Sequence, residues 1–225
     1  MSANNKTRKL TMLAMLCALS YVAVVIGRLF PPMIPATPFL TYDPKGIIIA
    51  IGGFIFGPLS AFAITVVVST IEMFTISETG FIGLIMNIIA TGAFACIAAL
   101  VYKKTHTISG AVIGLILGSI AMTAVMVLWN YLVTPFYMGV SRKVVTDLLV
   151  PAIIPFNLIK SGLNTAVTLI IYKPLVTALR KINLIESSET QEVKVTNSKK
   201  IGMFIFSFLL LATCILIVLV FQGKI

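Results

Sequence analysis

Charged residues are scarce in this sequence, since Asp, Glu, Lys and Arg together make up 11% of its 225 residues. Hydrophobic residues make up 59%, and the mean hydropathy is +1.07. A soluble domain carries about 25% charged residues, so this composition excludes a soluble protein and indicates a membrane protein. The sequence also lacks the alternating polarity over about ten residues that a transmembrane β-barrel requires. Its long, unbroken apolar runs predict an all-α integral membrane protein.

Catalytic and metal-binding motifs are absent. Cys17, Cys96 and Cys214 each stand alone in an apolar run, and a disulfide framework or a metal site needs paired spacing, so we expect neither. The sequence contains no GxxxxGK(S/T) phosphate loop, no HExxH metal motif and no GxSxG nucleophile motif. We therefore expect a chain that is not an enzyme, holds no cofactor and depends on a separate ATPase for any uphill transport.

Acidic residues are outnumbered by basic ones, 7 to 17, and the formal net charge is +10. The basic residues lie in short clusters beside apolar runs, which is typical of loops that face anionic lipid and not of a nucleic-acid site. A cytoplasmic N-terminus places eleven of them inside, Lys160 within a span, and five outside: Arg28, Lys45, Arg142, Lys143 and Lys224. This excess satisfies the positive-inside rule and predicts a multi-pass protein of the cell membrane.

Seven apolar runs are candidates for membrane crossings. They cover residues 10–30, 45–56, 59–76, 81–102, 108–132, 151–174 and 203–221. The run 45–56 is short and Gly57-Pro58 follows it, so 45–76 forms either two crossings joined by a tight turn, which we favour, or one kinked helix. The expected organisation is a cytoplasmic tail at 1–9, a six-helix membrane domain at 10–180, a cytoplasmic linker at 181–200 and an additional transmembrane helix at 201–225.

Two segments between these runs are expected to lie outside the membrane. Residues 31–44 contain five prolines, too many for a helix, yet they are apolar, so we expect an ordered extracellular cover over the helix ends. Residues 133–150 contain several charged side chains and are expected to form a second outer loop.

The run 151–174 carries three strongly polar residues, Asn157, Lys160 and Asn164. Their spacing of i, i+3 and i+7 places them on one stripe of a helix with about 3.6 residues per turn. A lysine at the bilayer centre costs about 2.5 to 3.5 kcal/mol and amides also need partners there, so the stripe must face protein, water or a ligand. One interpretation is hydrogen bonding between helices. The other is a binding site for a polar solute, which the lysine favours.

Other polar residues are also expected in the outer half of the membrane. With a cytoplasmic N-terminus, Glu72, Asn87 and Asn130 lie in the outer parts of their spans, and the inner halves are almost purely apolar. A channel needs polar groups at both levels, so we expect a pocket that opens outward and is closed below. Such polar groups with aromatic faces suit a planar heterocycle that has a polar tail. The candidate aromatic residues are Phe39, Tyr42, Trp129, Tyr131, Phe136 and Phe156.

Three short stretches occur in an order that is similar to a known family. They are FLTYDP at 39–44 followed by IGGFIFGP at 51–58, WNY at 129–131 followed by TPFY at 134–137, and IPFNLIK at 154–160 followed by GLN at 162–164. From about residue 10 to 180 the chain resembles the riboflavin-specific substrate-binding S components of energy-coupling factor (ECF) transporters. The resemblance implies a six-helix S-component bundle that binds riboflavin or FMN and docks onto a transmembrane coupling protein carrying two cytoplasmic ATPases.

The resemblance also implies functional residues. The substrate-binding set is Leu40, Thr41, Tyr42, Asn130, Asn157, Lys160 and Asn164, to which the depth of the polar side chains adds Glu72 and Asn87. Ala14 and Ala18 resemble the small-residue motif that contacts the coupling protein, with ordinary packing inside the chain as the alternative. Binding of another vitamin, such as thiamine or folate, and a membrane scaffold role are alternative functions. The run 203–221 departs from the family, whose members usually end after the sixth helix.

Overall fold

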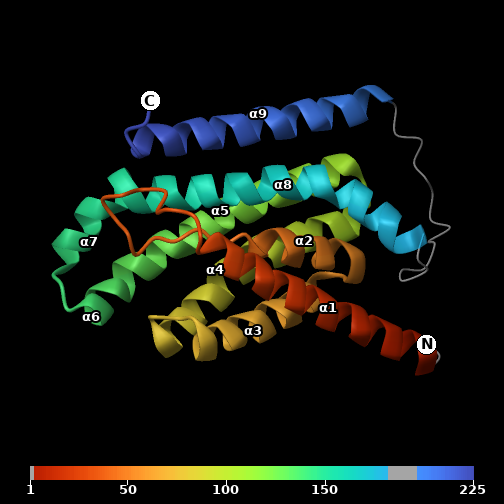
Figure 1. Ribbon diagram of the computed structural model, residues 1–225, viewed down its shortest axis with the longest axis horizontal. Coiled ribbons are helices and arrows are strands. Elements are labelled where there is room, and N and C mark those ends of the chain that lie inside the picture. The colour runs from red at the N-terminus through yellow and green to blue at the C-terminus, as the bar shows by residue number, and fades with distance from the viewer. Residues whose placement is uncertain (1–2, 182–196) are drawn as a thin grey trace.

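The computed structural model describes residues 3–181 and 197–225, and every regular element in these residues is a helix (Figure 1). The main helices are α1 (Ala3–Gly27), α2 (Lys45–Phe56), α3 (Pro58–Thr75), α4 (Gly80–Thr105), α5 (Ile108–Leu132), α8 (Ile154–Lys181) and α9 (Asn197–Phe221). Within the described residues, six helical segments are long and apolar enough to cross a membrane, and α2 is a shorter apolar helix. The predicted all-α membrane fold is confirmed.

Helices α2 and α3 form a tight antiparallel pair. Gly57 joins them with a φ of 90°, a backbone conformation that glycine adopts without steric cost. The contacts between the two helices run in opposite directions along the chain, since Gly53 packs against Ala61 while Lys45 reaches Glu72. The tight turn expected in this region is therefore present and a single kinked helix is excluded, while α2 itself is shorter than the helices that are long enough to cross a membrane.

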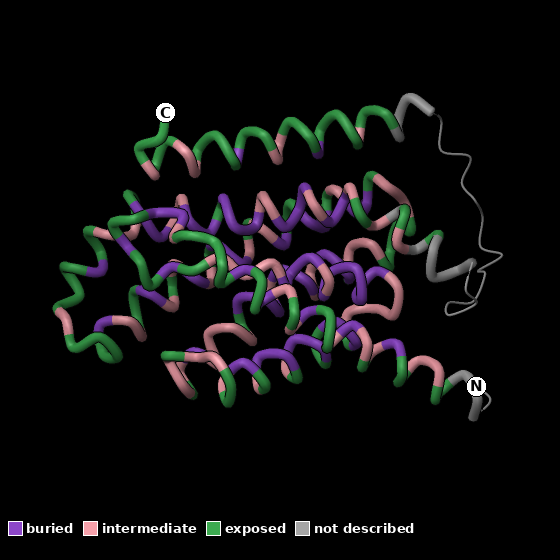
Figure 2. The backbone as a smooth tube through the Cα atoms, viewed as in Figure 1, coloured by how far each residue is buried: buried purple, intermediate pink, exposed green. Residues whose placement is uncertain are grey.

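Glycines allow α4 and α5 to pack closely. A Cβ atom added to Gly114 would lie 2.7 Å from the carbonyl oxygen of Ala98, and one added to Gly118 would clash with the carbonyl oxygen of Phe94. Residues without a side chain are what let two helix backbones approach to this distance. The inner faces of these helices are buried, as Figure 2 shows, and they join one apolar core that also includes α2, α3 and α8.

Several boundaries differ from the expected ones. Residues 133–150 are not an open loop, because they form α6 (Thr134–Met138), α7 (Arg142–Leu148) and the start of a π-helical turn (Leu149–Ile153) that leads into α8. Helix α7 buries Val145 and exposes Arg142, Lys143 and Asp147, and such a short amphipathic helix has no long apolar run to reveal it. The expected tail at 1–9 is helical from residue 3, and α9 begins inside the expected linker. The rest of that linker, residues 182–196, lies outside the described residues.

Residues 28–44, here named the cap segment, cover one end of the bundle between α1 and α2. Met33, Ile34 and Leu40 of this segment are buried in an apolar cluster with Ile153, which ends the π-helical turn, and Phe156 near the beginning of α8. The cap segment is therefore packed against the helices, as expected for an ordered cover. Helix α9 lies along α8 at one edge of the bundle, while α1 and α3 lie at the opposite edge (Figure 1).

Candidate functional site

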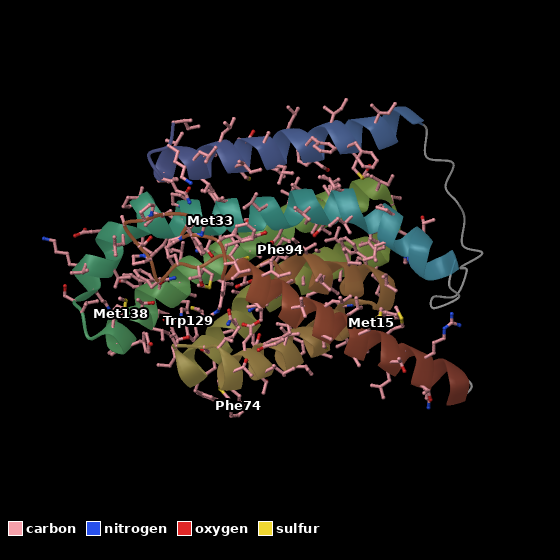
Figure 3. The ribbon with its side chains drawn as sticks, viewed as in Figure 1. Met15, Met33, Phe74, Phe94, Trp129 and Met138 are labelled. Atoms are coloured by element: carbon pink, nitrogen blue, oxygen red, sulfur yellow. The ribbon has the colours of Figure 1, made fainter. Side chains whose placement is uncertain are left out.

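A cavity of about 490 Å³ lies at the end of the bundle that carries the cap segment. Its walls come from the cap segment, the C-terminal ends of α1, α3 and α5, the first half of α4, and the beginning of α8. Figure 3 labels two of the lining residues, Trp129 on α5 and Met138 on α6, at this end of the molecule. Both the volume and the position between helices are typical of a small-molecule site.

Most of the predicted substrate-binding residues meet at this cavity. Those that line it are Leu40, Thr41, Tyr42, Glu72, Asn87, Asn130, Asn157 and Lys160. Asn164 does not line it; its Oδ1 instead accepts a hydrogen bond of 3.0 Å from the Tyr42 hydroxyl, which belongs to a lining residue. The stripe of three polar residues on α8 faces the protein interior, since the exposed fractions of Asn157, Lys160 and Asn164 are 1%, 9% and 2%.

Two of the lining amides are held in place by the helix backbone. The amide nitrogen of Asn130 donates to the Met126 carbonyl at 2.8 Å, and that of Asn157 donates to the Ile153 carbonyl at 2.8 Å. The Asn130 carbonyl oxygen also accepts a hydrogen bond of 3.0 Å from the Thr134 hydroxyl. A primary amide has two N–H donors and one carbonyl acceptor, so these backbone bonds use one donor of each amide and fix its orientation at the cavity wall.

Four charged side chains form a largely buried network that joins the cap segment to α2, α3 and α8. The Nζ atom of Lys45 lies 2.9 and 2.7 Å from the two carboxylate oxygens of Glu72 and 3.7 Å from Oδ2 of Asp43. The Nζ atom of Lys160 donates to the same Asp43 oxygen at 2.7 Å, and Asn87 donates to Glu72 at 3.1 Å. Two ammonium groups thus balance two carboxylates, which is the condition for burying charges at low dielectric constant.

Asp43 and Lys45 were missed by reasoning from the sequence. Lys45, counted from the sequence among the basic residues outside the membrane, has a side chain that is 0% exposed and is paired with Glu72 inside the protein. Lys45 begins α2 beneath the cap segment, where a carboxylate on the antiparallel neighbour compensates its charge. The signal was present, since a glutamate within an apolar run requires a cation, and Lys45 lies across the Gly57 turn from it.

The cap segment contains two groups whose protonation is shifted by this environment. Burial raises the pKa of the Asp43 carboxyl, but the Lys160 and Lys45 ammonium groups outweigh burial and hold that pKa below its ordinary value. Burial, and to a smaller extent the charge of Asp43, raises the pKa of Tyr42. Asp43 is therefore an anion at neutral pH, and Tyr42 keeps the proton that it donates to Asn164.

The expected aromatic residues divide into two groups. Phe39, Tyr42, Trp129 and Phe156 line the cavity and supply flat apolar surfaces beside its polar groups. Tyr131 and Phe136 are exposed instead, and the Arg142 guanidinium lies 5.7 Å from the centre of each ring. Those two rings, on α5 and α6, stabilise the position of Arg142 at the start of α7 and take no part in the cavity wall.

Ala14 and Ala18 lie on the outer surface of α1. Both are exposed, whereas Met12, Leu16 and Ser20 on the opposite face are buried. Ordinary packing inside the chain therefore does not explain the small pair in the part of the protein that the structure describes. A small-residue face on the outside of a membrane helix permits close approach of another helix.

Comparison with known proteins agrees with these features. A family model described as the substrate-specific component of ECF transporters matches residues 8–172. Riboflavin transporter RibU of Streptococcus thermophilus is 30% identical over 186 residues, covering 78% of this chain and 86% of its own length. Riboflavin transporter FmnP of Bacillus subtilis is 28% identical, covering 74% of this chain and 91% of its own.

A solved structure has the same fold. It is described as the S component of a bacterial ECF transporter, and it superimposes with a TM-score of 0.65 at 28% sequence identity. The match covers 98% of that chain but 77% of this one. Helix α9 lies beyond the residues that the family model matches.

Proposed function

Because the chain belongs to the substrate-specific components of ECF transporters, we propose that it captures riboflavin at the outer face of the cell membrane for import. Members of this family are transport components and not enzymes. The observation that carries the proposal is the cavity, in which fixed amides, a lysine and aromatic faces meet at one end of a bundle. Riboflavin has a flat ring system with carbonyl and N–H groups on one edge and a hydroxylated chain, so it matches both kinds of surface.

The charge balance of the cavity favours riboflavin over other vitamins. The charged groups at and below its wall are Arg28, Lys45 and Lys160 against Asp43, Glu72 and Glu78, which sum to zero. Riboflavin is neutral at pH 7, whereas thiamine is a cation and folate carries carboxylates. A neutral ligand leaves this balance intact, while a charged one adds an uncompensated charge to a partly buried site. FMN carries a phosphate dianion and is expected to bind more weakly for the same reason.

In this proposal, Asn130, Asn157 and Lys160 bind the polar edge of the ring or the hydroxylated chain, while Trp129 and Phe156 contact its faces. These roles are supported by the placement of all five residues on the cavity wall. The cap segment closes over the ligand through Leu40, Thr41 and Tyr42.

The first expected result is tight riboflavin binding by the purified full-length protein. Riboflavin fluorescence should be quenched at sub-micromolar concentration, because stacking on aromatic side chains in a dry cavity quenches the flavin. The measurement is a fluorescence titration, with thiamine and folate as competitors. Failure to quench, or equal competition by thiamine, would contradict the riboflavin assignment.

Import requires an energy source outside this chain, and the family implies an ECF module. In this proposal, the exposed Ala14 and Ala18 face contacts a transmembrane coupling protein that carries two cytoplasmic ATPases, and the N-terminus is cytoplasmic. Support comes from the exposure of both alanines on α1 and from their four-residue spacing.

The double variant Ala14→Leu/Ala18→Leu is expected to abolish co-purification with the coupling protein and riboflavin uptake by cells. Two leucines hold the neighbouring helix away from the α1 backbone, whereas the cavity is unaffected and riboflavin binding should persist. Ala212→Leu on the exposed face of α9 is the matched control. Normal uptake by the double variant would place the docking surface elsewhere.

A further inference from the structure

The cap segment is anchored to a helix that the family model does not include. The amide nitrogen of Gln222, directly after α9, donates to the Pro32 carbonyl at 3.1 Å. Cys214 of α9 is buried in the same apolar cluster as Met33 and Ile34 of the cap segment. Residues of α9 thus hold the first half of the cap segment by one hydrogen bond and by shared apolar surface.

The same face of α9 is seated on α8. A Cβ atom added to Gly162 would lie 2.9 Å from the Cys214 sulfur and 3.9 Å from Leu210, so the missing side chain of Gly162 is what lets α9 lie this close. Gly162 is two residues from Lys160, whose ammonium group holds Asp43 at the other end of the cap segment. The cap segment is therefore held at its start by α9 and at its end by α8.

The position of α9 leaves the proposed docking face uncovered. Helix α9 and helix α1 lie at opposite edges of the bundle, with α8 and α5 between them (Figure 1). The attachments described above join α9 to α8 and to the cap segment, and the cap segment supplies Leu40, Thr41 and Tyr42 to the cavity wall. A movement of α9 would therefore move the cap segment and, with it, residues of the cavity wall.

We propose that α9 is a clamp that holds the cap segment closed and thereby slows the release of the bound ligand. The inference rests on the proposed function for the identity of that ligand, riboflavin. Gln222 and Gly162 are positioning residues in this mechanism, since both act on the cap segment or on α9 and not on riboflavin itself. The clamp would control ligand exchange through a helix that lies beyond the residues matched by the family model.

The first test changes the hydrogen bond in the full-length protein. In Gln222→Glu an acceptor replaces the donor and faces the Pro32 carbonyl, so riboflavin release should accelerate by about 2- to 12-fold, the effect of losing one hydrogen bond. Gln222→Lys restores a donor and should return the release rate to that of the unchanged protein. Release is followed by stopped-flow fluorescence after mixing the loaded protein with an excess of a flavin-binding competitor protein.

The second test displaces α9 without touching Gln222. Gly162→Leu is expected to push α9 away from α8 and accelerate release, whereas Gly202→Leu, which adds the same bulk on α9 where nothing lies within 4 Å, should leave the rate unchanged. Normal release rates in both Gln222→Glu and Gly162→Leu would overturn the clamp.

A readout without riboflavin separates the clamp from the ligand assignment. Thr37 in the cap segment is 1% exposed, so the thiol of a Thr37→Cys variant should react slowly with a charged, membrane-impermeant maleimide. Mass spectrometry of the peptide that carries residue 37 measures this reaction separately from that of the native Cys17, Cys96 and Cys214. Adding Gln222→Glu or Gly162→Leu should speed this labelling, while Gly202→Leu should not. If the protein fails to bind riboflavin but labelling follows this pattern, the proposed ligand is wrong and the clamp stands. A labelling rate that rises with neither Gln222→Glu nor Gly162→Leu counts against the clamp.

Discussion

Replacing Lys45 by methionine is expected to destabilise the protein by about 3 to 5 kcal/mol, the cost of removing one partner from a buried ion pair. Lys45 is 0% exposed and binds both oxygens of Glu72. Methionine fills a similar volume and leaves little empty space. The lower stability of the variant therefore comes mainly from the carboxylates of Glu72 and Asp43, which lose their partner. Thermal unfolding in detergent, followed by the fluorescence of the single tryptophan, Trp129, measures the change.

Two further variants show whether charge is the cause. In Lys45→Met/Glu72→Leu the unpaired carboxylate is removed together with its partner, so the double variant should be more stable than Lys45→Met alone. Lys143→Met makes the same substitution at an exposed lysine of α7 and should change stability by no more than about 0.5 kcal/mol. A double variant that is less stable than the single one would show that the network contributes through packing instead.

Replacing Lys160 by alanine is expected to weaken riboflavin binding by about 1 to 3 kcal/mol, or about 5- to 150-fold in Kd. The ammonium group lines the cavity and lies 2.7 Å from Asp43 of the cap segment. Its removal has two effects: the ligand loses a hydrogen-bond donor, and the end of the cap segment loses its attachment to α8. Isothermal titration with riboflavin measures the loss.

Asp43→Asn separates these two contributions of Lys160. The amide keeps the shape of Asp43 and weakens its attraction to Lys160, so the cap segment is loosened while the ammonium group stays available to riboflavin. We expect a smaller loss of affinity than in Lys160→Ala, with Lys143→Ala as the exposed control. Equal losses in the two variants would mean that Lys160 acts only through the cap segment, and unchanged affinity in both would assign the network to stability alone.

The helices themselves follow from the sequence. In a bilayer every backbone N–H and C=O group must be paired within the segment, so each long apolar run predicts a helix with little dependence on its neighbours. The same reasoning turned the stripe of Asn157, Lys160 and Asn164 inward, because lipid offers those groups no partners. Helices α6 and α7, which lie outside the long apolar runs, escaped prediction because each is anchored to the bundle by a single buried residue, Pro135 in α6 and Val145 in α7.

The partners of the polar side chains were decided by the tertiary structure. Tyr42 pairs with Asn164 across 122 residues and Lys160 with Asp43 across 117, and no local pattern encodes such distances. A buried charge requires a partner of opposite charge, but only the packing of the helices determines which residue is that partner. The sequence likewise did not decide whether Ala14 lies on the inner or the outer face of α1, because alanine is tolerated on both. The sequence by itself thus determined which segments form apolar helices and that their polar groups turn inward, since those depend on the solvent around each helix. Only the packed bundle determined which of these groups neutralise one another and which remain at the cavity wall.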